Sequence, residues 1–434
     1  MIKMGVTTCF DRSLVGSGVY SPFNRRLIHR PPRILPSKST VKRPERAIRI
    51  GDHINPYTGE ITMGQSYIPL SRLEGTNRAI GIFGETGAGK SVTARDIIEY
   101  FSIEEGRCVI IFDDTKNQYW SFKQKQDRAP MVNKLRSLGL EPMAIPEVCV
   151  YAPAYDEPVL GIENMRRDFY VDKLLSIKTS AITAEAFFEL GNIDSSGRMY
   201  HNQLKRILNV PAEQRTVDYI KNELALGMVD TTLKRSISSL INIFEPLCSM
   251  GIIRDDGTDV KEMLHPPRKG KPGRISVINL ATSKANDCRK NAIVSTICQQ
   301  IFDYVRADRN IKPVIFLDEA KSYIGKKSSE ATLSAFSLLH LQGRAWDITR
   351  IWGFQNQDDI VDWVFNGNTN YLIEMKKSLP LLDGGRDADG IIRNPTVIND
   401  SGLAHIYIKG SGDPSIPDMD MYAKVFPCRS KHVD

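Results

Sequence analysis

The eight residues GETGAGKS, Gly84–Ser91, restrict the possible fold more than any other segment of this 434-residue chain. They fit the pattern GxxxxGK[ST] and follow an apolar run, AIGIF (79–83), that predicts a strand. A helix is predicted from about Lys90. In this context glycines let the backbone turn its N–H groups toward phosphate oxygens, and the helix N-terminus adds a positive dipole end. The segment therefore predicts a phosphate-binding loop (P-loop) in an α/β protein.

The loop and the start of the helix supply the predicted contacts to a nucleotide. We expect Lys90 to reach the β and γ phosphates and Ser91 to ligate Mg²⁺, so ATP and Mg²⁺ are the predicted cofactors. A chance match in a glycine-rich turn is the alternative, and the flanking strand and helix argue against it. The predicted nucleotide-binding residues are Gly84, Glu85, Thr86, Gly87, Ala88, Gly89, Lys90, Ser91 and Val92.

The apolar run VIFLDEA, 314–320, ends in the carboxylates that a hydrolytic P-loop protein needs. Asp318 is predicted to hold the metal through its water shell, and Glu319 to act as the general base toward water. No guanine-selecting NKxD follows Asp318, which argues against a GTPase. An ordinary strand followed by an exposed acidic pair is the alternative interpretation.

A third strand tip carries an amide. The run TRIWGF, 349–354, ends in Gln355. A polar amide beside the acidic strand can sense the γ-phosphate, and we list Gln355 with Glu319 among the predicted catalytic residues. A glutamine that simply starts a loop is the alternative.

The remaining apolar runs alternate between strand and helix patterns, which is typical of a parallel sheet. Helices are predicted near 287–306 and 329–345, with a short one at 358–365. The predicted class is α/β: a RecA-like P-loop ATPase core with a helical insert and a short β-rich N-terminal segment. The further predicted strands are CVIIF (108–112), VCVYAP (148–153), ISVINL (275–280), TNYLIEM (369–375) and, last in the chain before an irregular tail, AHIYIKG (404–410).

The distance between the two main motifs indicates the domain organisation. Asp318 follows Lys90 by 228 residues, and apolar residues recur at helical spacing through 162–264. This favours a motor with an inserted subdomain over a small kinase or GTPase. The predicted parts are a basic Pro-rich arm (1–45), a short β-rich segment (46–78), the first part of the core (79–161), a helical insert (162–274), the second part of the core (275–410) and a C-terminal tail (411–434).

The charge distribution and the cysteines indicate which partners and which cellular location to expect. The net charge is +7, but residues 1–50 alone sum to +9 and the remainder to −2. The basic arm could dock on DNA, join subunits or partners, or be an organellar targeting peptide, although its prolines disfavour the helix such a peptide needs. The seven cysteines are scattered, which favours a reducing, cytoplasmic location and argues against a zinc site. No apolar run approaches the ~20 residues that span a bilayer.

Together these motifs resemble the HerA/FtsK superfamily of ring-forming ATPases, and HerA-like proteins in particular, from about Arg46 to the tail. NRAIGIFGETGAGKS is similar to the family's opening, with Arg78 before the strand. VIIFDDTKNQY resembles the second-strand motif DPxGEY, with Asp113 and Tyr119 kept and Asn117–Gln118 in place of Gly-Glu. GRAWDITRIWGFQNQDDI is similar to the unit that begins with an arginine and ends in TQxPxDI, which selects Arg344 and again Gln355.

The resemblance implies a homo-oligomer, a hexameric ring with ATP held between subunits and double-stranded DNA in the pore. It implies that Arg344 acts in trans on the phosphates and that Arg78 is a second interface arginine; a surface or ion-pair role is the alternative for each. The lysine loop after Glu319, KSYIGKKSSE, could grip the DNA backbone without reading bases, or could be merely solvated. Its candidate DNA contacts are Lys321, Lys326 and Lys327.

Three functions stay open at this point. The first is an ATP-driven translocase of double-stranded DNA, used in repair and end processing with a nuclease partner or in DNA packaging. The second is a secretion or conjugation ATPase that drives export of protein or nucleoprotein. The third is a P-loop protein that serves as an interaction scaffold.

Overall fold

The computed structural model describes residues 47–433 apart from gaps at 56–59, 71–78, 115, 191–197, 228–233, 282–286, 329, 344, 366–368, 381–396 and 410–418. The predictions for the basic arm, Arg78 and Arg344 therefore lie outside the described residues. The strands of the large sheet are β1 (Ala47–Ile54), β2 (Ile61–Pro69), β3 (Ala79–Gly84), β4 (Val109–Asp113), β5 (Val148–Pro153), β6 (Lys173–Leu175), β9 (Ile275–Asn279), β10 (Val314–Leu317), β11 (Thr349–Phe354), β12 (Tyr371–Pro380), β13 (Val397–Ile408) and β14 (Met419–Val425).

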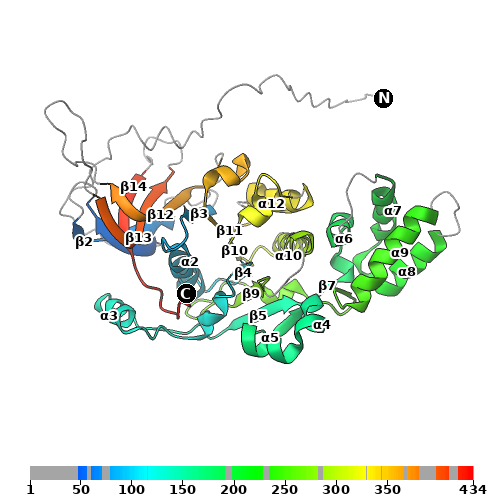
Figure 1. The fold of residues 1–434 in the computed structure, drawn as a ribbon, viewed down its shortest axis with the longest axis horizontal. Coiled ribbons are helices and arrows are strands. Elements are labelled where there is room, and N and C mark those ends of the chain that lie inside the picture. The colour runs from blue at the N-terminus through cyan, green and yellow to red at the C-terminus, as the bar shows by residue number, and fades with distance from the viewer. Residues whose placement is uncertain are drawn as a thin grey trace, which may run out of the picture. The chain divides into compact units, whose positions relative to one another are not determined.

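Within the described ranges these twelve strands form one sheet in the order β2-β1-β14-β13-β12-β3-β11-β10-β4-β9-β5-β6 (Figure 1). Every pair from β12 to β6 is parallel. The P-loop strand β3 lies between β12 and β11, and the acidic strand β10 lies between β11 and β4. Because parallel strands end at the same edge of a sheet, this order brings the P-loop, Gln355 and the acidic pair to one edge. The predicted α/β class with a mostly parallel sheet is confirmed.

The other end of the sheet is antiparallel. There β12 pairs with β13, β13 with β14, β14 with β1, and β1 with β2. The prediction of an irregular tail after the strand at 404–410 is wrong for β14. Met421 and Ala423 are its buried residues within 420–425, a weak pattern, and its place is decided by pairing with the preceding strand β13 and with β1, which is distant in sequence. Beyond β14 the chain returns to the P-loop helix, where Glu99 accepts hydrogen bonds from the N–H groups of Arg429 and Ser430.

Helices cover both faces of the parallel part. On one face α2 (Lys90–Glu99), which continues as a π-helical turn η3 (Tyr100–Glu104), packs through Ile97 and Ile98 in the core cluster that holds Ile80 and Ile82 of β3. On the other face α12 (Glu330–Gln342) packs through Phe336 on Trp352 of β11, and α10 (Asp287–Ala307) contacts α12.

One predicted helix is wrong. The segment 358–365 instead forms two short 3₁₀ turns, η9 (Gln357–Asp359) and η10 (Asp362–Val364). Between them Ile360 makes a β-bridge to Gly325, and the Val361 N–H donates to the Ile324 carbonyl. The backbone is thus used for contacts to another loop, which a continuous helix would not permit.

The segment between β5 and β9 is largely helical, but it also carries short strands. Here β6 joins the large sheet beside β5, while β7 (Ile177–Lys178) and β8 (Ile253–Arg254) pair with each other. Across the described ranges no helix is both long and apolar enough to cross a membrane. The helices of this segment are α4 (Glu157–Leu160), α5 (Ile162–Phe169), α6 (Ala184–Leu190), α7 (Arg198–Leu208), α8 (Val217–Gly227) and α9 (Lys234–Ser249).

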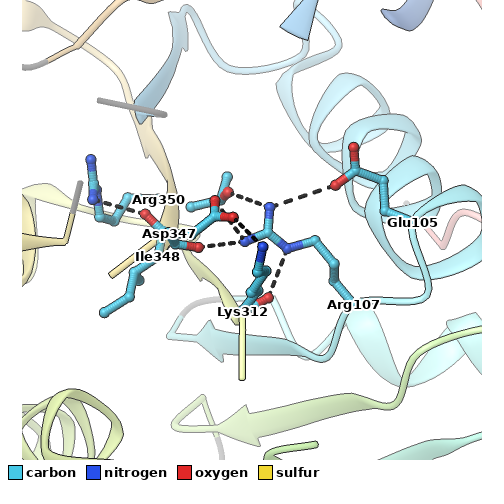
Figure 2. A network of polar contacts seen from close by, with 7 residues as sticks. Glu105, Arg107, Lys312, Asp347, Ile348 and Arg350 are labelled. Carbon is cyan, nitrogen blue, oxygen red and sulfur yellow. Dashed lines mark hydrogen bonds and ion pairs between the residues drawn. The ribbon is translucent and has the colours of Figure 1, made fainter. Parts of the chain in front are cut away.

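A polar network closes the amino-terminal edge of the parallel strands (Figure 2). Arg107, just before β4, is only 2% exposed. Its guanidinium donates to the Lys312 carbonyl at 2.7 Å, the Thr349 hydroxyl at 3.0 Å and the Asp347 carbonyl at 2.5 Å. One arginine therefore ties together the segments that lead into β4, β10 and β11.

Candidate nucleotide site

The P-loop turns sharply where β3 ends. Gly84 has a φ of 135°, and a Cβ there would lie 2.1 Å from the Met375 carbonyl oxygen of β12. Only glycine fits this position. Gly89 is the N-cap of α2, and no side chain caps this helix. The first N–H groups of α2 are therefore free of a side-chain acceptor and oriented to bind an anion.

A pocket opens between the P-loop, the tip of β10 and the tip of β11. It is lined by Lys90, Ser91, Asp318, Glu319 and Gln355, together with Thr86 and Lys116. The structure thus brings together side chains from three separate motifs that the sequence analysis selected.

Lys90 folds back onto the loop in this structure. Its ammonium donates to the carbonyl oxygens of Gly84 at 2.6 Å and Glu85 at 3.0 Å. Burial lowers the pKa of Lys90, and the charges of Glu319 and Asp318 oppose that shift. Lys90 therefore lies close enough to Asp318 and Glu319 for their negative charges to act on it.

The acidic pair is poorly solvated. Burial raises the pKa of Asp318, even though the Tyr119 hydroxyl donates to Asp318 Oδ1 at 2.8 Å. Burial and then the charge of Asp318 raise the pKa of Glu319. Burial and the charge of Asp318 also raise the pKa of Asp113, at the end of β4, to about 7. A bound cation would favour the charged form of each carboxylate, so the cluster is suited to hold one.

The loop after β4 reaches the P-loop directly. The Asp113 carboxylate accepts hydrogen bonds from the N–H groups of Gln118 at 2.8 Å and Tyr119 at 3.2 Å. The Gln118 amide donates to Ser91 Oγ at 3.1 Å. Asn117 has a φ of 46°, a left-handed conformation that asparagine tolerates better than most residues. Of the two residues that stand in place of the motif's Gly-Glu, Asn117 thus adopts a left-handed turn conformation and Gln118 contacts the serine of the P-loop.

The tip of β11 is held against both neighbouring strands. A Cβ at Gly353 would lie 2.5 Å from the Asp318 carbonyl oxygen, so glycine permits the close approach of the two strand ends. The ring of Phe354 stacks on Phe83 of β3 at a centroid distance of 5.5 Å. Gln355 directly follows Phe354, is exposed and lines the pocket.

Of the predicted DNA-contacting lysines, Lys321 begins the short helix α11 (Lys321–Ile324) and is not on a loop as predicted, while Lys326 and Lys327 lie on the turn after it. Lys321 forms an ion pair with Asp359 at 2.9 Å, and Lys326 with Asp362 at 3.8 Å. Lys327 is exposed. The Lys326 N–H also donates to the Asp359 carbonyl at 3.0 Å. The two segments that leave the acidic strand and the Gln355 strand therefore contact each other.

Two lysines near the P-loop were missed by the sequence analysis. Lys116 lines the pocket from within the DPxGEY-like motif, so the motif itself was a usable signal. Lys377 lies on β12 with its ammonium 3.8 Å from Glu85 Oε2. Its position follows from the pairing of Met375 with Gly84, and no sequence pattern indicates that register.

The oxygen donors of the pocket suit a metal ion that is bound beside a nucleotide. Within the described ranges no group of three His, Cys, Asp or Glu side chains could hold one. Mg²⁺ beside a nucleotide needs only one or two protein oxygens, because phosphates and waters complete its shell. Ser91 and Asp318 meet that requirement.

Comparisons with known proteins give one family and several distant structures. A family model described as the central domain of the helicase HerA matches residues 57–301, more than half of the chain. No protein of curated function matches the chain in sequence.

Three solved structures illustrate the structural similarity. VirB4 of Thermoanaerobacter pseudethanolicus has 14% identity and a TM-score of 0.49 over 88% of this chain and 96% of that chain. The plasmid coupling protein TrwB in complex with ADP and Mg²⁺ has 11% identity and a TM-score of 0.47 over 90% and 98%. EssC (ATPases 2 and 3) from Geobacillus thermodenitrificans has 12% identity and a TM-score of 0.33 over 93% and 49%.

Proposed function

Because the chain belongs to the family of the HerA helicase central domain, we propose that it is an ATPase that uses ATP and Mg²⁺ to move double-stranded DNA. The observation that carries the proposal is the convergence of Lys90, Ser91, Asp318 and Glu319 on one pocket at the carboxyl edge of the sheet. These four side chains supply a phosphate-binding cation, two oxygen ligands for a metal and a base.

Each residue has a distinct part in hydrolysis. Lys90 leaves the P-loop carbonyls to bind the β and γ phosphates, and the N-terminus of α2 binds the phosphate chain. Ser91 and Asp318 hold Mg²⁺, which when bound neutralises charge on the phosphate oxygens. Glu319 accepts the proton of the attacking water, and Gln355 contacts the γ-phosphate from the tip of β11.

The proposal extends to a hexameric ring with the site at a subunit interface. In it Arg344 reaches the phosphates of the neighbouring subunit, with Arg78 as a second interface residue. Subunits carrying Arg344→Ala, mixed with subunits carrying Lys90→Ala, should then recover part of the wild-type hydrolysis rate. A mixture as inactive as its components would show that Arg344 does not act across an interface.

The lysine loop gives the ring a route from nucleotide to DNA. Lys321 and Lys326 are joined by ion pairs to the segment after Gln355, so a shift of Gln355 would move or release them. Contacts of this kind need charge and no base readout. Repair with a nuclease partner and DNA packaging are both compatible uses of such a motor.

The test is ATP hydrolysis by the purified full-length protein with and without added duplex DNA. The proposal expects faster hydrolysis with duplex than without, and weaker stimulation as salt rises. Hydrolysis that ignores duplex would contradict DNA translocation and favour a secretion or conjugation ATPase. No hydrolysis under either condition would favour a scaffold.

A further inference from the structure

The β4 loop, defined as the described residues 114 and 116–118, is fastened to several parts of the nucleotide site. Its Gln118 amide bonds to Ser91 of the P-loop helix. Asn117 accepts a hydrogen bond from the Asn279 amide at the end of β9. Asp114 forms an ion pair with Lys290 of α10 at 2.8 Å, with both side chains largely buried. Three contacts, to α2, to the end of β9 and to α10, therefore hold the described residues of this loop in place.

Lys116 belongs to this loop and lines the pocket. The main chain that follows it is anchored by Asp113, whose carboxylate accepts hydrogen bonds from the N–H groups of Gln118 and Tyr119. The side chain of Lys116 is exposed. In the described part of the chain no hydrogen bond or ion pair engages its ammonium, whereas Lys90, Lys321 and Lys326 each have such a partner.

The charge of Lys116 acts on the groups of the pocket. It partly offsets the rise in pKa that burial causes in Asp318 and Glu319, and it adds to the fall that burial causes in the pKa of Lys90. Lys116 thus lies close to both carboxylates without pairing with either. A second cation beside Lys90 repels it, so the arrangement is most favourable when an anion lies between the two lysines.

We propose that Lys116 is a second phosphate-binding lysine, which contacts the terminal phosphate of a bound nucleoside triphosphate from the β4 side of the pocket. The inference rests on the proposed function and adds a residue to its site. Lys116 shares the pocket wall with Glu319 and Gln355, the residues that face the terminal phosphate in that proposal. A lysine serves as a compact point charge for phosphate, and one on a fastened loop loses less freedom on binding.

The experiment compares nucleotides that differ in the terminal phosphate. Affinities of the full-length protein for ATPγS and for ADP are measured with Mg²⁺ for wild type, Lys116→Ala and Lys116→Arg. We expect Lys116→Ala to weaken ATPγS binding about 10- to 100-fold, as for a lost charged hydrogen bond, and to change ADP binding by no more than about twofold. Lys116→Arg should retain most of the ATPγS affinity, because it keeps the charge.

The matched control is Lys173→Ala. Lys173 is an exposed lysine on β6, paired with Glu262, so its loss removes the same charge away from the pocket. It should leave both affinities at the wild-type level.

Three results would overturn the inference. Wild-type discrimination between ATPγS and ADP in Lys116→Ala would show that the lysine makes no contact with the terminal phosphate. Equal loss of both nucleotides would show a merely structural role. A wild-type protein that binds neither nucleotide would reject the proposed function itself, a failure that is separate because it precedes any comparison of variants.

Discussion

The two edges of the parallel sheet both hold buried charges, but they balance them differently. At the amino-terminal edge, Arg107 donates to three protein oxygens and lies 3.4 Å from the Asp347 carboxylate and 3.6 Å from that of Glu105 (Figure 2). At the carboxyl edge, Asp318 and Glu319 are close together and have raised pKa values. At the amino-terminal edge, carboxylates of the chain itself neutralise the charge of Arg107. At the carboxyl edge, two adjacent carboxylates have like charges that a bound cation would neutralise.

Structural and functional charges in the same fold differ in where their partners come from. A charge whose partners are all supplied by the protein contributes to stability, and its removal exposes unpaired groups. A cluster of like charges with raised pKa values lowers stability in the free protein and is explained by a ligand. Variants at the two edges should therefore alter different observables.

The largest effect is expected at the carboxyl edge. Glu319→Gln should bind ATP but slow turnover about 10²- to 10⁴-fold, because the amide cannot accept the proton of the attacking water. Its melting temperature should be at least that of wild type, since the change removes one of two adjacent carboxylates. Turnover is measured by phosphate release and binding by a fluorescent ATP analogue. Turnover near wild type would remove Glu319 from the mechanism.

A variant at the amino-terminal edge should lower stability and leave turnover unchanged. Arg107→Met should lower the free energy of unfolding by about 3 kcal/mol, since it leaves buried oxygens without a donor. The turnover of the fraction that remains folded should be unchanged. Urea unfolding and phosphate release measure the two quantities.

The control for that variant is Arg136→Met. Arg136 lies on α3 (Ala129–Ser137), is 62% exposed and forms a 3.7 Å pair with Glu141. Its loss should cost less than about 0.5 kcal/mol. If Arg107→Met were as stable as this control, the amino-terminal edge would not have the structural role given to it.

The smallest effect is a pH dependence in the antiparallel part of the sheet. His405 of β13 lies 3.0 Å from the Asp420 carboxylate and 3.7 Å from that of Glu374. Burial alone would lower the pKa of His405, but these two hydrogen-bonding carboxylates outweigh it and raise the pKa. The stability from the charged histidine is therefore present below about pH 6.5, the unfolded value, and lost as pH rises through the folded value.

Replacing His405 with a neutral residue tests the direction of this dependence of stability on pH. His405→Gln should lose about 1 kcal/mol more stability relative to wild type at pH 6 than at pH 9. Equal losses at both pH values would show that His405 is not charged in the folded protein. Hydrolysis of ATP at a fixed pH should not change, because this cluster lies outside the pocket.

Most parallel strands of the fold were predictable from sequence, and the antiparallel end of the sheet and the segment after Gln355 were less so. The runs 148–153 and 349–354 coincide with β5 and β11, because strands buried on both faces read as unbroken apolar runs. The strand β14, which lies between β1 and β13, has a weak alternating pattern and was missed. The helix predicted at 358–365 is replaced by 3₁₀ turns, since its backbone pairs with a loop far away in sequence.

In the candidate site, too, some residues could be predicted from the sequence and others could not. Lys90, Asp318 and Gln355 stand at strand ends with recognisable motifs, so the fold places them together once the strand order is set. The DPxGEY-like motif marks the segment that contains Lys116, but the structure was needed to place this lysine at the pocket, because its position depends on hydrogen bonds of Asp113 and Gln118. Arg78 and Arg344 stay predictions, and the mixed-subunit experiment tests Arg344.

The central claim is that the carboxyl edge of this sheet hydrolyses ATP. Its most direct test is the rate of phosphate release from ATP with Mg²⁺ and duplex DNA, for the full-length wild-type protein beside Lys90→Ala at equal folded concentration. The account predicts steady turnover by wild type and none above background for Lys90→Ala. Equal rates for the two proteins, or no turnover by wild type, would contradict it.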